Sequence, residues 1–106
     1  MELPSAVNAY FEADRGDDAE ALGRAFRADA AVRDEGAVHQ GVEAIRAWWL
    51  AAKRKYRHVA EPIGVTGTGE KVSVRARVSG RFPGSPATLD FVFTLADGGI
   101  VGLDIR

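Results

Sequence analysis

Residues 71–79, KVSVRARVS, decide the fold, because small apolar side chains alternate there without a break with polar or charged ones. Successive side chains of a β-strand point to opposite faces, so this stretch predicts a strand with one face in the core and the other in water. A second apolar row follows the loop at 83–86, and the turn at 97–99, DGG, leads into a third strand at 101–105. The second row consists of Leu89, Phe91, Phe93 and Leu95. Three strands joined by short turns predict an antiparallel meander.

Upstream of these strands, residues 42–56, VEAIRAWWLAAKRKY, predict the longest and most apolar helix of the chain. Its apolar stripe recurs at helical spacing through Ile45, Trp49, Ala52 and Tyr56. The turn between this half and the first strand of the meander is predicted at 66–69, TGTG. The strands must bend to cover a single helix, and Gly64, Gly80 and Gly102 are suitable bend points. We therefore expect a sheet that wraps around the helix.

Two short helices are predicted near the N-terminus, and they should pack as a hairpin. The first follows Pro4, and a capping box at 17–20 opens the second. A short strand at 30–34 runs into a turn at 34–36, DEG. A further strand is expected to carry Val59, Ile63 and Val65 on one face. The chain 1–106 is thus predicted to be one α+β domain.

The composition is that of a globular protein, with 46% hydrophobic and 27% charged residues among 106. A formal charge of −1 gives no electrostatic footprint for nucleic acid. The chain has no cysteine, which excludes a disulfide scaffold, a thiolate zinc site and a cysteine nucleophile. No apolar run approaches the ~20 residues of a membrane helix, and the first residues lack the pattern of a signal peptide. We expect a cytoplasmic protein that binds neither nucleic acid nor membranes.

The order of these elements resembles the nuclear-transport-factor-2-like (NTF2-like) superfamily, and within it the SnoaL-like, or polyketide-cyclase-like, group. Residues 26–36, FRADAAVRDEG, 38–48, VHQGVEAIRAW, and 91–101, FVFTLADGGIV, carry the resemblance. It implies a cone, in which a strongly curved antiparallel sheet surrounds the long helix and a pocket opens at the wide end. It also implies a homodimer that pairs through the sheet. Members of this superfamily include isomerases and cyclases as well as non-catalytic dimers.

Asp34 and Tyr10 are the first candidates for catalytic residues. Alternation places Asp34 on the face of Val32, and a carboxylate in an apolar cavity can act as a general base. In ketosteroid isomerases, which share the superfamily, the base aspartate stands eight residues after a similar phenylalanine, as Asp34 does after Phe26. An oxyanion-binding tyrosine precedes that phenylalanine by sixteen residues, as Tyr10 does here. The other interpretation is that Asp34 is a turn residue and Tyr10 a core residue.

His39 and the pair Trp48 and Trp49 complete the candidate site. His39 is expected near the mouth of the cone, where it could move a proton or polarise an oxygen, or be a hydrogen-bonded bystander. The two tryptophans face directions about 100° apart on a helix, so one can line a ligand pocket while the other packs in the core or at a subunit interface. Two histidines without cysteines make a weak metal site, and no metal is expected.

Asp90 tests how far the resemblance to ketosteroid isomerases extends, because those enzymes keep a protonated aspartic acid on this strand. Here the apolar row occupies the alternate positions, so we predict that Asp90 points away from the cavity and pairs with an arginine. The chain is therefore expected to bind a small apolar or amphipathic molecule, with cofactor-independent acid–base chemistry if it is an enzyme. The alternative is a non-catalytic homodimeric binding or interaction module.

Overall fold

The computed structural model describes residues 1–67 and 69–106, so Thr68, inside the predicted turn 66–69, lies outside the described residues. The helices are α1 (Ser5–Arg15), α2 (Ala19–Arg24) and α3 (Val42–Tyr56). The strands are β1 (Phe26–Asp34), β2 (Ala37–Gln40), β3 (Val59–Thr66), β4 (Lys71–Ser79), β5 (Ala87–Ala96) and β6 (Gly99–Ile105). The bounds of α3 are those predicted from its apolar stripe.

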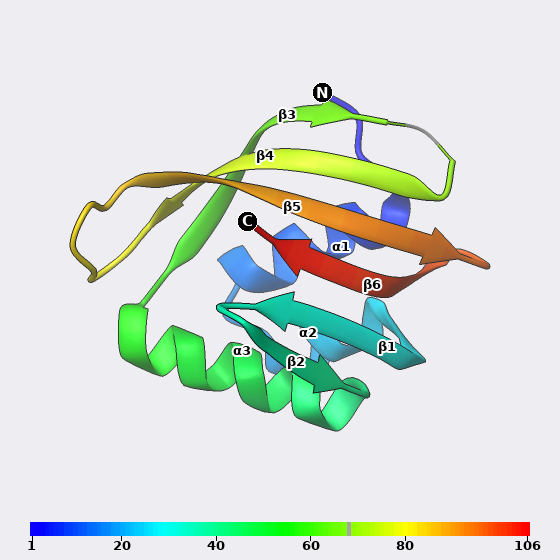
Figure 1. The fold of residues 1–106 in the computed structure, drawn as a ribbon, viewed down its shortest axis with the longest axis horizontal. Helices are drawn as coiled ribbons and strands as arrows, with labels where there is room; N and C mark the ends of the chain where they lie inside the picture. The colour runs from blue at the N-terminus through cyan, green and yellow to red at the C-terminus, as the bar shows by residue number, and fades with distance from the viewer. Residues whose placement is uncertain (68) are drawn as a thin grey trace.

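One curved, unclosed sheet carries all the described strands, in the order β2-β1-β6-β5-β4-β3. The pairs within β3–β6 are antiparallel, as predicted for the meander, whereas β1 runs parallel to β6. The helices lie on one side of the sheet, with α1 behind β5 and β6 and α3 along β1 and β2 (Figure 1). This is the predicted α+β architecture, in which the sheet is curved and helices cover its concave side.

The core lies between the concave face and α1, and the predicted alternation fills it. Val72, Val74, Ala76 and Val78 of β4 are buried, as are Phe91 and Phe93 of β5. An aromatic cluster joins these strands to the first helix, with ring centroids 5.2–6.5 Å apart, and consists of Tyr10, Phe11, Phe26, Phe91 and Phe93. Aromatic pairs at this spacing are favourable beyond the area they bury. The cluster therefore fixes α1, and Tyr10 with it, against β5.

Two local predictions are wrong. The expected common face of Val59, Ile63 and Val65 is broken by a register shift between Pro62 and Gly64. Such a bulge moves the following side chains to the opposite face. Val59 and Ile63 are therefore 41% and 47% exposed, while Val65 packs on the core. The second helix is capped by Asp18, whose side chain accepts from the Ala21 amide at 3.0 Å, rather than by the box at 17–20.

The prediction for Asp90 is confirmed. Arg75 lies opposite it on β4 and donates from Nε to Asp90 Oδ1 at 3.0 Å and from its terminal nitrogen to Oδ2 at 3.3 Å. The hydrogen bond from Arg75 lowers the pKa of the Asp90 carboxyl group, which stays ionised on the outer face of the sheet. A protonated aspartic acid that faces the cavity from this strand is absent from the described chain. No helix among the described residues is long and apolar enough to span a membrane.

Candidate functional site

A cavity of about 470 Å³ opens at one end of the sheet, where β1, β4 and β6 end and where β3 and β5 begin. Its wall combines apolar and aromatic side chains with a few polar groups. The lining residues are Tyr10, Asp14, Asp34, Glu35, Trp48, Ala52, Tyr56, His58, Ala60, Val78, Phe82, Pro83, Ala87, Leu89, Phe91 and Ile105. Small-molecule sites are built in this way, with an apolar wall and a small number of placed polar groups.

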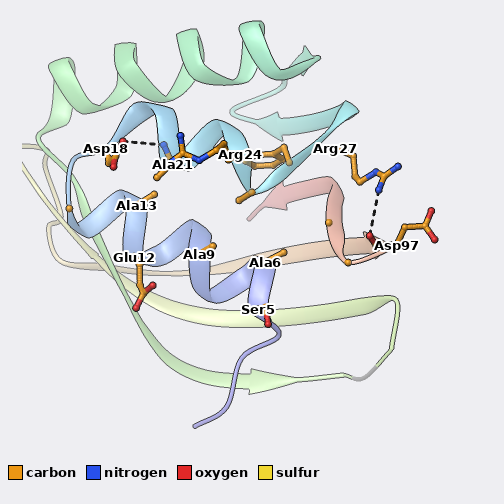
Figure 2. A pocket seen from close by; sticks show the side chains of 15 residues that line it. Ser5, Ala6, Ala9, Glu12, Ala13, Asp18, Ala21, Arg24, Arg27 and Asp97 are labelled. Carbon is orange, nitrogen blue, oxygen red and sulfur yellow. Dashed lines mark hydrogen bonds between the residues drawn. The ribbon is translucent and has the colours of Figure 1, made fainter.

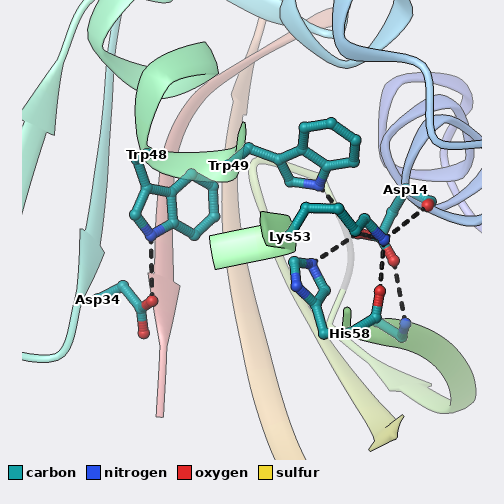
Figure 3. A network of polar contacts seen from close by, with 7 residues as sticks. Asp14, Asp34, Trp48, Trp49, Lys53 and His58 are labelled. Atoms are coloured by element: carbon teal, nitrogen blue, oxygen red, sulfur yellow. Dashed lines mark hydrogen bonds and ion pairs between the residues drawn. The ribbon is translucent and has the colours of Figure 1, made fainter. Parts of the chain in front are cut away.

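Asp34 is both the last residue of β1 and part of the cavity wall. The tight turn that follows has Glu35 and Gly36 at positive φ, which reverses the chain into β2. Asp34 Oδ2 accepts a hydrogen bond from Trp48 Nε1 at 3.1 Å (Figure 3). The turn and the site interpretations of Asp34 are therefore compatible, because the residue that ends the strand also presents its carboxylate to the cavity.

Tyr10 lines the same cavity from α1 although only 2% of it is exposed to solvent. Its ring belongs to the aromatic cluster, but no hydrogen bond joins its hydroxyl to another group of the described chain. Burial raises the pKa of Tyr10 well above its ordinary value, and the nearby Asp14 and Asp34 carboxylates raise it further. The hydroxyl is therefore neutral at physiological pH and can donate to an oxygen atom of a bound molecule.

The other predicted site residues lie around Trp48. Trp48 lines the cavity, whereas Trp49 is buried behind the wall with 1% of its surface exposed. His39, on β2, is outside the lining set, and its ring lies 5.9 Å from that of Trp48. The structure thus brings Asp34, Trp48 and Tyr10 to one cavity, and leaves His39 beside Trp48 but outside the cavity wall.

Asp14 is the site residue that sequence reasoning missed. Its carboxylate is 1% exposed and accepts from Trp49 Nε1 at 2.9 Å, from the Ala60 amide at 3.0 Å and from His58 Nε2 at 2.9 Å (Figure 3). Lys53 Nζ lies 3.3 Å from Asp14 Oδ1 and also donates to the main-chain carbonyls of Asp14 and His58. The signal was present, because Asp14 follows Val7, Tyr10 and Phe11 at helical spacing and puts a charge on a buried stripe.

These contacts determine the state of the pair Asp14 and His58. Burial alone would raise the pKa of Asp14, but the hydrogen bond and charge of His58, with the Ala60 and Trp49 hydrogen bonds, lower it instead. An ionised carboxylate only accepts, so His58 Nε2 must carry a hydrogen. In the neutral ring Nδ1 is then an acceptor, and it faces the side on which Trp48 and Asp34 lie (Figure 3).

The end of α3 explains why His58 points into the site. Arg57 adopts a left-handed conformation, with φ 51° and ψ 40°, and its amide closes the helix on the Lys53 carbonyl at 2.8 Å. The chain reverses there, so that β3 begins at Val59 with His58 turned back toward α1. A left-handed residue after a helix is a common way of ending one, and in this chain it positions a cavity side chain.

Comparison with known proteins gives the family. The sequence matches the family described as a SnoaL-like domain over residues 7–103. The chain belongs to the SnoaL-like family. A "putative polyketide cyclase" from Sinorhizobium meliloti is 56% identical, with a TM-score of 0.95 over 98% of this chain and 95% of that one. No curated protein matches the sequence.

More distant structures share the fold of this SnoaL-like domain. A Catenulispora acidiphila protein with a ketosteroid isomerase-like fold, in complex with trimethylamine, is 22% identical, with a TM-score of 0.86 over 99% of this chain and 86% of that one. A second "putative polyketide cyclase", from Xanthomonas campestris, is 23% identical, with a TM-score of 0.82 over 95% of this chain and 86% of that one. The expected NTF2-like architecture is confirmed.

A second hollow of the SnoaL-like domain, of about 760 Å³, lies over α1 and α2 and reaches the turn at 97–99 (Figure 2). Its wall is formed largely by alanines of the two helices. Two of its charged side chains have partners, since Asp18 caps α2 and Arg27 donates to the Asp97 carbonyl at 3.5 Å. None of the sequence-predicted site residues lines it. In the described ranges, no three His, Asp or Glu side chains are grouped so as to hold a metal ion.

Proposed function

We propose that this SnoaL-like domain binds a small, mostly apolar or amphipathic molecule in the 470 Å³ cavity and moves a proton on it without a cofactor. One observation carries the proposal: the Tyr10 hydroxyl, which has no hydrogen-bond partner among the described residues, shares an apolar cavity with two groups that can accept a proton, Asp34 and His58. A hydrogen-bond donor beside a proton acceptor is the minimum set for removing a proton next to a carbonyl group. The name that the S. meliloti relative carries belongs to the same class of chemistry.

In the proposed step a C–H bond beside a carbonyl group breaks and its proton passes to the cavity acceptor. The electron pair moves to the carbonyl oxygen, which accepts a hydrogen bond from Tyr10. The acceptor then returns the proton to another atom of the same molecule, so that no co-reactant is needed. Asp34 can act through the oxygen that Trp48 leaves open, and His58 through Nδ1. His39, packed on Trp48, is proposed to hold the indole in place.

Elimination of 5-nitrobenzisoxazole tests the proposal, because this reaction needs a base and releases a coloured phenolate. If Asp34 is the base, D34N should lower the rate tenfold or more, and if His58 is the base, H58Q should do so. D90N removes a carboxylate from the outer face and should keep the wild-type rate.

A rate equal to that of acetate and imidazole in free solution, in all variants, would contradict the catalytic part of the proposal. Thermal-shift screening against a metabolite library then separates the two remaining interpretations. A stabilising compound whose effect is lost in D34N retains the binding function. The absence of any such compound favours the non-catalytic interaction module.

A further inference from the structure

The charges on the cavity wall have one sign. The ionisable side chains that line it, apart from His58 and the two tyrosines, are the carboxylates of Asp14, Asp34 and Glu35, and neither Lys nor Arg is among the lining residues. The charge of Asp14 is compensated by Lys53, whose Nζ lies 3.3 Å away behind the wall. Within the described chain, Asp34 and Glu35 make no ion pair. The cavity therefore presents a net negative charge to its ligand.

Trp48 adds a surface that attracts cations. Its Nε1 donates to Asp34 Oδ2 at 3.1 Å, so the indole and the carboxylate form one unit of the wall (Figure 3). The His39 ring lies 5.9 Å from that of Trp48 and is not part of the cavity wall, so the part of the indole that lines the cavity is left for a ligand. Cations bind over aromatic faces, most strongly over tryptophan. A cation placed there would also meet Asp34 Oδ1, which no group of the described chain occupies.

The rest of the wall fits the apolar parts of such a ligand. Tyr56, Phe82 and Phe91 supply further aromatic surface, and the Tyr10 hydroxyl, which has no partner among the described residues, is available to an oxygen atom of the ligand. A strongly hydrated ammonium with free N–H groups would leave donors unpaired against these rings. An alkylated ammonium carries its charge on apolar groups and avoids that cost.

We propose that the ligand is a tertiary or quaternary ammonium compound with an oxygen function, whose cationic head lies between Trp48 and Asp34. This inference rests on the small-molecule function proposed above and adds the ligand class. It assigns the charge-pairing role to Asp34, so that proton transfer falls to His58, which Asp14 orients from the opposite wall.

The test compares choline with 3,3-dimethylbutan-1-ol, which has the same shape but a carbon in place of the charged nitrogen. Binding to the full chain is followed by NMR titration, which also measures millimolar affinities. Choline should bind at least tenfold more tightly than the alcohol, and added salt should weaken choline alone. D34N should reduce the affinity for choline about tenfold and leave the alcohol unchanged. D90N removes a carboxylate from the outer face and should change neither affinity.

W48L gives an independent measurement if D34N does not fold. It should lower the affinity for choline relative to that for the alcohol, rather than weaken both ligands equally. Equal affinities in the wild-type protein would overturn the ammonium proposal and leave the small-molecule function standing. Equal weakening of both ligands by D34N would also overturn it, since Asp34 would then only shape the cavity. If neither ligand binds while 5-nitrobenzisoxazole is still converted, the ligand class is wrong and the proton-transfer function survives.

Discussion

Asp14 is a carboxylate on an otherwise apolar face of α1, and its burial is tolerated because both of its oxygen atoms accept hydrogen bonds. Trp49 and Lys53 come from α3, His58 comes from the segment between α3 and β3, and the Ala60 amide comes from β3. A buried charge with this many partners is tolerated, but the removal of one partner leaves the others uncompensated. Asp14 therefore links α1 to α3 and to the segment that begins β3, and it also sets the tautomer of His58.

D14N should destabilise the protein by about 3–5 kcal/mol, because it leaves Lys53, only 12% exposed, without its counter-charge. The measurement is the free energy of unfolding in urea at neutral pH. D90N is the matched control, since it removes a carboxylate from an exposed ion pair, which contributes little to stability. Similar losses in the two variants would mean that the contacts of Asp14 do not hold these elements together.

The same residue predicts a pH dependence. The pKa of Asp14 is lower in the folded protein than in the unfolded chain, so its stabilising contribution is present above the ordinary value near ~3.9. The contribution is lost as the pH falls through the lowered folded pKa, where the carboxylate must be protonated. Acid unfolding followed by circular dichroism should therefore be less steep in D14N than in the wild-type protein. An unchanged acid transition would contradict the ionised state of Asp14.

At the residue scale, the alternation of apolar and polar residues predicts the face of a side chain on a strand, but it does not predict the contacts of Asp14. Asp34 and Asp90 were placed on their faces correctly because β1 and β5 keep a period of two in these stretches. Asp14 and His58 meet across 44 residues, and only the tertiary packing of α1 against the end of α3 brings them together. A charge on a buried stripe indicates that a partner must exist, but the spacing along α1 does not say which residue it is.

At the element scale, close packing at the end of α3 matters as much as the helix itself. A Cβ atom on Gly80, just after β4, would lie 2.6 Å from the Tyr56 carbonyl oxygen and 3.1 Å from the His58 Cα. Both neighbours are main-chain atoms and cannot rotate away. Gly80 thus allows the end of β4 to touch the segment that carries His58, rather than serving only as a bend in a strand.

G80A should therefore lower the free energy of unfolding by about 1–3 kcal/mol, and it should also weaken any ligand that contacts His58. Gly64 provides the control, since it lies at the bulge of β3 without a positive φ, and a Cβ atom added there would meet no other atom within 4 Å. G64A should be neutral or slightly stabilising, because it reduces the freedom of the unfolded chain. Urea unfolding of both variants gives the comparison. A loss in G64A as large as in G80A would contradict the close approach at Gly80 as the cause.

Some element boundaries follow from local periodicity, and others depend on distant parts of the chain. The α3 helix and the strands of the meander could be predicted because their periodicity is regular over many residues. The buried face of β3 could not be predicted, because the bulge between Pro62 and Gly64 puts the alternating positions before it and after it on opposite faces. Nor could the start of β1 at Phe26, since its parallel pairing with β6 depends on a strand at the other end of the chain.

At the scale of the whole molecule, no helix of the described chain covers the outer face of the sheet (Figure 1). Val92, near the middle of this face on β5, lies between Ser73 and Asp104 and is half-buried. Val59 and Ile63 add exposed apolar surface on β3. Apolar side chains on an uncovered sheet face favour an interaction site there, and an isologous contact between two copies is the usual way to cover such a face.

We therefore predict a homodimer that pairs through this face. A stable interface removes about 800 Å² per partner from water, and a lysine at its centre would place a long, strongly hydrated side chain where the two sheets must pack. V92K should convert the dimer to a monomer by light scattering while the circular dichroism spectrum stays unchanged. L50K introduces the same side chain at an exposed apolar position of α3, 42% exposed, and should remain dimeric. A wild-type protein that is monomeric at micromolar concentration would contradict the dimer. Dissociation by L50K instead of V92K would keep the dimer and move its interface to the helical side, where the hollow over α1 and α2 becomes the surface to examine.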